Sequence, residues 1–150
     1  MNRVVIKLGT GLLSAGNGDI RQERISQICS GIDSLKQKEI EVILVSSGAV
    51  GLGMGKLGLN ERPKEISLLR ACASIGQSEL MHAWKSSLSN HGYLASQILL
   101  TREDFNEHNR SQKVRETIET LLEKNVVPVV NENDSISDEE LKFGDNDVLS

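Results

Sequence analysis

The sequence predicts an α/β fold in which helices sandwich a mainly parallel sheet. Short apolar runs typical of strands alternate along the chain with longer segments whose apolar residues recur at helical spacing. Glycine-rich or polar segments follow the apolar runs, as expected where parallel strands end at a ligand-binding edge. Because 150 residues are the size of one ordinary domain, we expect a single domain over residues 1–150.

The first half of the chain predicts a strand, a helix, a second strand and a long second helix. Residues 4–8 form the first apolar run, and a glycine turn follows at residues 9–11. Between positions 25 and 35, apolar residues recur every three or four positions, which indicates a surface helix. Residues 42–45 form the second strand, and helical periodicity covers about residues 64–89. This order implies parallel strands joined by crossovers.

The alternation continues to the end of the chain. Residues 94–100 are predicted to form a strand, residues 109–124 a helix, and residues 126–130 a strand that leads into a very polar loop. A parallel sheet therefore accounts for the whole length.

The composition argues against nucleic acid and membranes as partners. Aromatic residues make up only 3% of the chain and its net charge is −4, whereas proteins that bind nucleic acid need stacking side chains and a basic face. The apolar run at residues 4–6 is far too short for a signal peptide or a membrane span, so we expect a cytoplasmic protein. Cys29 and Cys72 lie in helical patterns and are expected to be buried free thiols. The three histidines lack paired spacing, so no metal site is predicted.

Lys7 and the glycine turn after it are candidate phosphate contacts. An ammonium group in an apolar strand is costly to bury unless it faces an anion, although an exposed edge strand is the simpler alternative. The backbone amides of Gly9, Thr10 and Gly11 can approach a phosphate closely. A lysine and a glycine turn in this order suit a transferring phosphoryl group, so these four residues are candidate phosphate contacts and Lys7 is a candidate catalytic residue.

A second glycine-rich segment, residues 46–53, joins a strand to a probable helix. Its amides suit a carboxylate or a phosphate, although a tight connecting turn is the alternative interpretation. Residues 53–58 match the dinucleotide pattern G-x-G-x-x-G, but the match begins several residues after the strand, and no acidic residue closes a second strand about twenty residues later. The alternative that the protein is a nicotinamide-dependent oxidoreductase depends on these glycines alone. The G-x-x-x-x-G-K-[ST] phosphate loop is absent from the sequence.

Two clusters of Asn and Asp lie near the end of the chain. Residues 131–134 leave a strand that is expected to be buried, and residues 143–147 follow about ten positions later. Carboxylates for an ammonium group and amides for a carboxylate are what a zwitterionic amino acid requires. A Ca²⁺ loop is the alternative, but the spacing does not match the EF-hand pattern.

Taken together, these segments resemble the amino acid kinase family, and within it the glutamate 5-kinases. Six stretches match and occur in family order, at residues 5–10, 45–50, 73–77, 97–101, 129–134 and 143–150. The first two are shared loosely with acetylglutamate, aspartate, carbamate and uridylate kinases, whereas the last three together are specific to the glutamate-phosphorylating branch.

The resemblance implies a role for single residues. Lys7 would contact the transferring phosphoryl group of ATP, and Asp134 would be the acid that holds glutamate. Further contacts with glutamate would come from the second glycine turn and from the two Asn/Asp clusters. The predicted glutamate-binding residues are Ser47, Gly48, Asn131, Asp134, Asn146 and Asp147.

The resemblance also implies an activity. Such enzymes use Mg-ATP to phosphorylate the side-chain carboxylate of L-glutamate, giving glutamyl 5-phosphate in the first step of proline synthesis. Many are inhibited by proline and assemble as dimers or tetramers. In the family a nucleotide-binding half follows the last motif, so we expect residues 1–150 to be its substrate-binding N-terminal portion and to be inactive alone. The alternatives are another member of the family and a module that only binds glutamate or proline.

Overall fold

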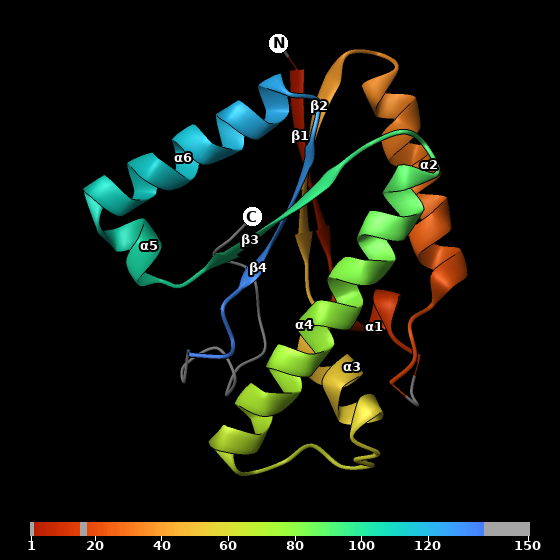
Figure 1. The fold of residues 1–150 in the computed structure, drawn as a ribbon, viewed down its shortest axis with the longest axis vertical. Helices are drawn as coiled ribbons and strands as arrows, with labels where there is room; N and C mark the ends of the chain where they lie inside the picture. The colour runs from red at the N-terminus through yellow and green to blue at the C-terminus, as the bar shows by residue number, and fades with distance from the viewer. Residues whose placement is uncertain (1, 16–17, 137–150) are drawn as a thin grey trace.

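The computed structural model describes residues 2–15 and 18–136, which contain one four-stranded sheet (Figure 1). The strands are β1 (Asn2–Leu8), β2 (Ile40–Ser46), β3 (Ala95–Leu100) and β4 (Val127–Glu132). They lie in the order β1-β2-β4-β3, and every neighbouring pair is parallel. All four carboxyl ends therefore lie along one edge of the sheet, which confirms the predicted α/β class.

In the described part of the chain, three long helices cover the sheet and three short ones follow strands. The long helices agree with the predicted segments to within a few residues, and each joins one strand to the next. The long helices are α2 (Gln22–Lys36), α4 (Ile66–Ser89) and α6 (His108–Glu123), and the short ones are α1 (Thr10–Leu13), α3 (Ala49–Lys56) and α5 (Glu103–Asn106).

Strand alternation divides the core between the two faces of the sheet. Val42 and Leu44 point to one face, where they pack with apolar residues of α2 and α4 around the fully buried Trp84. Ile43 and Val45 point to the other face and pack beneath α6. The two sets belong to separate core clusters because successive side chains of a strand alternate between its faces. Figure 1 shows α6 on the opposite side of the sheet from α2 and α4.

The cysteines are buried, as predicted. Cys29 packs on α2 in the larger core cluster, and burial raises the pKa of its thiol to about 11. Cys72 is buried on α4. Both are free cysteines. Because a thiol with a raised pKa carries little thiolate at neutral pH, Cys29 is a packing residue and not a nucleophile.

Helix α3 occupies a segment that the sequence predicts only as a turn. Three of its eight residues are glycines, which have low helix propensity and therefore conceal the helix from a propensity argument. Tertiary packing explains them. A methyl group on Gly53 would overlap the Cys72 carbonyl, and one on Gly76 would overlap the Ala49 carbonyl. Backbone thus lies against backbone between α3 and α4, and the first residue of α3, Ala49, is fixed by that contact.

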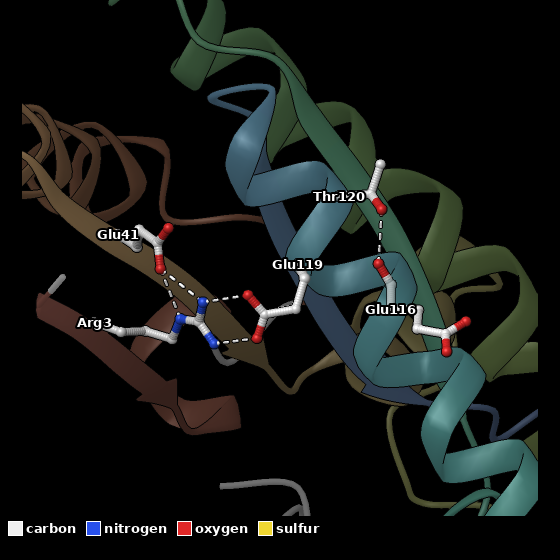
Figure 2. A network of polar contacts seen from close by, with 5 residues as sticks. All are labelled: Arg3, Glu41, Glu116, Glu119 and Thr120. Atoms are coloured by element: carbon white, nitrogen blue, oxygen red, sulfur yellow. Dashed lines mark hydrogen bonds and ion pairs between the residues drawn. The ribbon is translucent and has the colours of Figure 1, made fainter.

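An ion-pair network connects β1 and β2 to α6 (Figure 2). The Arg3 guanidinium donates two hydrogen bonds to the Glu119 carboxylate, at 2.8 and 2.7 Å, and one to Glu41 at 2.8 Å. Glu41 lies opposite Arg3 in the register of β1 and β2, whereas Glu119 belongs to α6. The bidentate geometry makes this pair stronger than an ordinary surface ion pair.

We predict that Glu119→Gln lowers the melting temperature of the complete protein at low salt, with a difference that shrinks as salt is added. The hydrogen bond from Arg3 lowers the pKa of Glu119, so the carboxylate stabilises the fold above its ordinary titration range. That contribution is lost as the pH falls through the lowered pKa.

Thermal unfolding of Glu119→Gln and of Glu123→Gln, an exposed acid of the same helix, checks this prediction. Equal melting temperatures for the two variants at every salt concentration would contradict it.

Candidate functional site

The parallel register brings the predicted site segments together at one edge of the sheet. Leu8 lies opposite Ser46 in β1 and β2, and Leu99 lies opposite Asn131 in β3 and β4. The backbone N–H of Ser47 donates to the Leu8 carbonyl at 3.0 Å, so the ends of β1 and β2 stay joined beyond the last ladder pair. The segments after β1, β2 and β4 therefore leave the sheet side by side.

Lys7 lies in the last part of β1 and is partly buried. It lies opposite Val45 in the ladder, and Val45 belongs to the core cluster beneath α6. Lys7 therefore leaves the sheet on the α6 face, because paired residues of neighbouring strands point the same way. Asn131 instead points to the α4 face, where its amide bonds Gln77. The two predicted residues approach the edge from opposite faces.

The first glycine turn begins a short helix. Gly9 precedes α1 in an extended conformation, and the N–H of Leu12 donates back to its carbonyl at 3.1 Å. Gly9, Thr10 and Gly11 are all exposed. The backbone at the start of α1 therefore lies at the protein surface, beside the carboxyl ends of the strands. The structure thus agrees with the prediction of an accessible turn after Lys7.

The second glycine turn lies against the first. Gly48 has a φ of 109°, a conformation that side chains disfavour, and it precedes α3. A Cβ atom on Gly48 would lie 3.8 Å from the Cα of Thr10. Below the turn, Trp84 of α4 donates its indole N–H to the buried Ser46 hydroxyl at 3.0 Å. The end of β2 is therefore held by α4, and Ser47, which is partly buried, follows directly.

A cleft of about 510 Å³ lies between α4 and the ends of β3 and β4. It contains Asp134 of the predicted site, together with Ala49 from the second glycine turn. Asn131 is only 2% exposed and does not line this cleft. Its amide bonds Gln77 in the interior, and its predicted direct contact with the amino acid stays a prediction. The cleft is also lined by Gln77, Gln97 and Glu132, which lie in the motif segments but were given no role of their own. His82 and Lys85 line it as well.

Comparison with known proteins now identifies the family. The model of the amino acid kinase family matches residues 2–150. The chain belongs to the amino acid kinase family.

Individual members of the amino acid kinase family are similar over the whole chain. This chain is 45% identical over 150 residues to glutamate 5-kinase 2 of Bacillus subtilis, and the match covers 100% of this chain and 40% of that protein. The glutamate 5-kinase of Clostridium acetobutylicum is also 45% identical, with 100% of this chain and 56% of that protein covered. For the glutamate 5-kinase of Aquifex aeolicus the identity is 45%, with 99% and 42% covered. The chain thus spans about half or less of the length of these relatives.

In this member of the amino acid kinase family, a partly buried acid holds the turn after β3. The Asp104 carboxylate accepts hydrogen bonds from the Thr101 N–H at 2.7 Å and from Arg110 at 2.8 Å. Burial alone would raise the pKa of Asp104, but these bonds together outweigh it and lower the pKa. Asp104 therefore stays ionised at neutral pH and anchors α6 to the end of β3.

Three further predictions concern the C-terminal motif, metal sites and membrane spans. Asn146 and Asp147 lie outside the described residues. Within residues 2–15 and 18–136, no group of three or more His, Cys, Asp or Glu side chains is placed to hold a metal ion. The helices described for this chain include none long and apolar enough to cross a membrane.

Proposed function

We propose that the complete protein is a glutamate 5-kinase, which transfers the γ-phosphoryl group of Mg-ATP to the side-chain carboxylate of L-glutamate. The observation that carries this proposal is the meeting of two glycine turns, Lys7 and the Asp134 loop at one edge of a parallel sheet. The relatives named glutamate 5-kinase, at about 45% identity over the whole chain, support the same substrate.

Charge neutralisation and positioning would supply the catalysis. The attacking carboxylate is ionised at neutral pH, so the reaction needs no general base and no covalent enzyme intermediate. Lys7 would place a positive charge beside the transferring phosphoryl group, and the exposed amides of Gly9, Thr10 and Gly11 fit phosphate oxygens. Bound Mg²⁺ would neutralise charge on the nucleotide phosphates. Because the chain is net acidic, these local groups must attract the anionic substrates themselves.

The amino acid would lie in the cleft beside Asp134. Its ammonium group is proposed to pair with the Asp134 carboxylate, and a carboxylate to meet the Ser47 side chain and the backbone N–H of Gly48 at the start of α3. Asn131 would support this loop from the interior. We propose Asn146 and Asp147 as further contacts from the C-terminal motif.

Regulation and location follow from the same proposal. Proline carries the α-ammonium and α-carboxylate of glutamate, so it is the proposed feedback inhibitor at this cleft. We also propose a homo-oligomer, dimer or tetramer, that works in the cytoplasm.

A titration of the complete protein tests the substrate. Glutamate, aspartate, N-acetylglutamate and proline are titrated separately by calorimetry, with and without a non-hydrolysable ATP analogue. We expect glutamate to bind more tightly than N-acetylglutamate, which has no ammonium group to pair with Asp134. We expect it to bind more tightly than aspartate because the relatives are named glutamate 5-kinases. Preference for N-acetylglutamate or aspartate would instead place the protein in another branch of the family.

Asp134→Ala should weaken glutamate binding by about 2 kcal/mol or more, because the variant leaves the substrate ammonium without a partner in a partly dry site. Calorimetry on the complete protein measures the difference, with the exposed Glu61→Gln as a charge control. The same glutamate affinity in Asp134→Ala and in the parent would exclude the pairing.

A further inference from the structure

Gln77, near the middle of α4, links the neighbouring strands β3 and β4 through its side-chain amide. Its Oε1 accepts a hydrogen bond from Asn131 Nδ2 of β4 at 2.8 Å, and its Nε2 donates to Gln97 Oε1 of β3 at 3.0 Å. Asn131 Oδ1 in turn accepts from the backbone N–H of Glu132 at 2.9 Å. Gln77 is 8% exposed and Asn131 is 2% exposed, so the chain of amides begins in the interior.

A backbone group sets the direction of the whole chain of hydrogen bonds. The N–H of Glu132 can only donate, so the oxygen of the Asn131 amide must face it and the nitrogen must face Gln77. Gln77 then has to accept with its oxygen and donate to Gln97 with its nitrogen. A carboxylate at position 77 lacks the donor, and an apolar side chain lacks both groups. The amide of Gln77 therefore satisfies both neighbours as they are oriented here.

The chain of amides lies beside the proposed glutamate cleft. Gln77 and Gln97 both line it, together with Asn133 and Asp134 from the loop that begins two residues after Asn131. The N–H of Asn133 also donates to the Leu100 carbonyl at 2.8 Å, so this loop leaves β4 in a fixed direction. The orientation of Asn131 therefore bears on the position of Asp134.

Gln77 also follows the point where α4 and α3 are closest. Gly76 lies against the backbone of Ala49, and Ala49 directly follows Ser47 and Gly48 in the chain. One turn of α4 therefore contacts both halves of the proposed site, the glycine turn through Gly76 and the Asp134 loop through Gln77. This turn fixes the distance between the two groups that would hold the ends of one amino acid.

We propose that Gln77 is a positioning residue of the glutamate site, which acts through Asn131 to hold the Asp134 loop in place against the start of α3. This inference rests on the proposed function and names the side chain on which its substrate geometry depends. Because Gln77 positions the loop that would hold the amino acid, and not the transferring phosphoryl group, its loss should raise the KM for glutamate and leave kcat nearly unchanged.

The test uses Gln77→Leu in the complete protein, which removes both hydrogen bonds at similar side-chain volume. We expect the KM for glutamate to rise by about tenfold, whereas kcat and the KM for ATP change by less than about threefold. Gln77→Met, which is unbranched like Gln, repeats the measurement with the least change in packing and decides the matter if the Leu variant does not fold.

Ser87→Ala is the matched control. Ser87 is buried on the same helix and accepts a hydrogen bond from Gln22 at 2.9 Å, so its loss also removes one polar contact of α4. Ten residues separate it from Gln77, which places it about 15 Å further along the helix. An equal rise in the KM for glutamate in Ser87→Ala would show that general loosening of α4 is responsible, and would overturn the inference.

A double-mutant cycle tests the route through Asn131. If Gln77 acts through Asn131, the KM for glutamate should be the same in Asn131→Ala and in the double variant with Gln77→Leu. Additive effects, or an unchanged KM in Gln77→Leu and Gln77→Met, would overturn the inference while the parent still phosphorylates glutamate. A parent that does not phosphorylate glutamate would instead refute the proposed function, and this inference with it.

Discussion

Lys7→Met in the complete protein should lower the rate of phosphoryl transfer by about a hundredfold or more, with little change in glutamate affinity. The side chain leaves the end of β1 on the α6 face, whereas the cleft that contains Asp134 lies on the α4 side. Its charge is therefore expected to act on the phosphoryl group as it passes along the edge, and not on the amino acid. Methionine has nearly the same length, so the variant removes the charge and preserves most of the packing.

The rate at saturating glutamate and Mg-ATP and the glutamate affinity together measure this effect. Lys38→Met, at an exposed position after α2, is the control for the loss of one positive charge. Unchanged turnover in Lys7→Met would remove this residue from the mechanism and would leave the glycine turns without a positive partner at this edge.

Gly76→Ala should destabilise the complete protein by about 3 kcal/mol or more. The added methyl group would overlap the Ala49 carbonyl and would lie 2.6 Å from the Gly53 nitrogen. Backbone atoms cannot rotate away as a flexible side chain does, so α3 and α4 must separate. Because α3 begins one residue after Gly48, the separation should also reduce glutamate binding.

Gly31→Ala is the matched substitution for this prediction. Gly31 lies in α2, is exposed, and a Cβ atom there would meet no atom within 4 Å. This variant should be more stable than the parent by about 0.5–1 kcal/mol, because alanine favours a helix over glycine. Chemical denaturation of both variants gives the comparison. If Gly76→Ala unfolded at the same denaturant concentration as Gly31→Ala, the close packing of α3 on α4 would be wrong.

The elements of the fold were largely predictable because their signals are local. Apolar runs and helical periodicity identify all four strands and the three long helices to within a few residues. Helix α3 was not predicted, since its glycines are needed for contact with a helix that lies far away in the sequence. The position of β4 between β2 and β3 was not predicted either. The alternation of strands and helices gives crossovers but not the order of strands in a sheet.

The candidate site was predictable as a set of segments and not as a geometry. Lys7 lies near the end of a strand, and both glycine turns and the Asp134 loop follow strands, so their placement at one edge follows from a parallel sheet. The opposite faces of Lys7 and Asn131 depend on register between strands, which period-two alternation within each strand does not give. Gln77 was noticed only as part of a family motif. Its role depends on partners 20 and 54 residues away, and no local pattern indicates them.

The most direct test of the account is the product that the complete protein forms from L-glutamate and Mg-ATP. Glutamyl 5-phosphate is an acyl phosphate, so hydroxylamine traps it as a hydroxamate that can be quantified beside ADP. We predict equal amounts of ADP and hydroxamate, dependent on glutamate and reduced by about a hundredfold in Lys7→Met. Glutamate that binds without ATP turnover, or ADP release without hydroxamate, would contradict the assignment of this sheet edge to phosphoryl transfer onto the glutamate side chain.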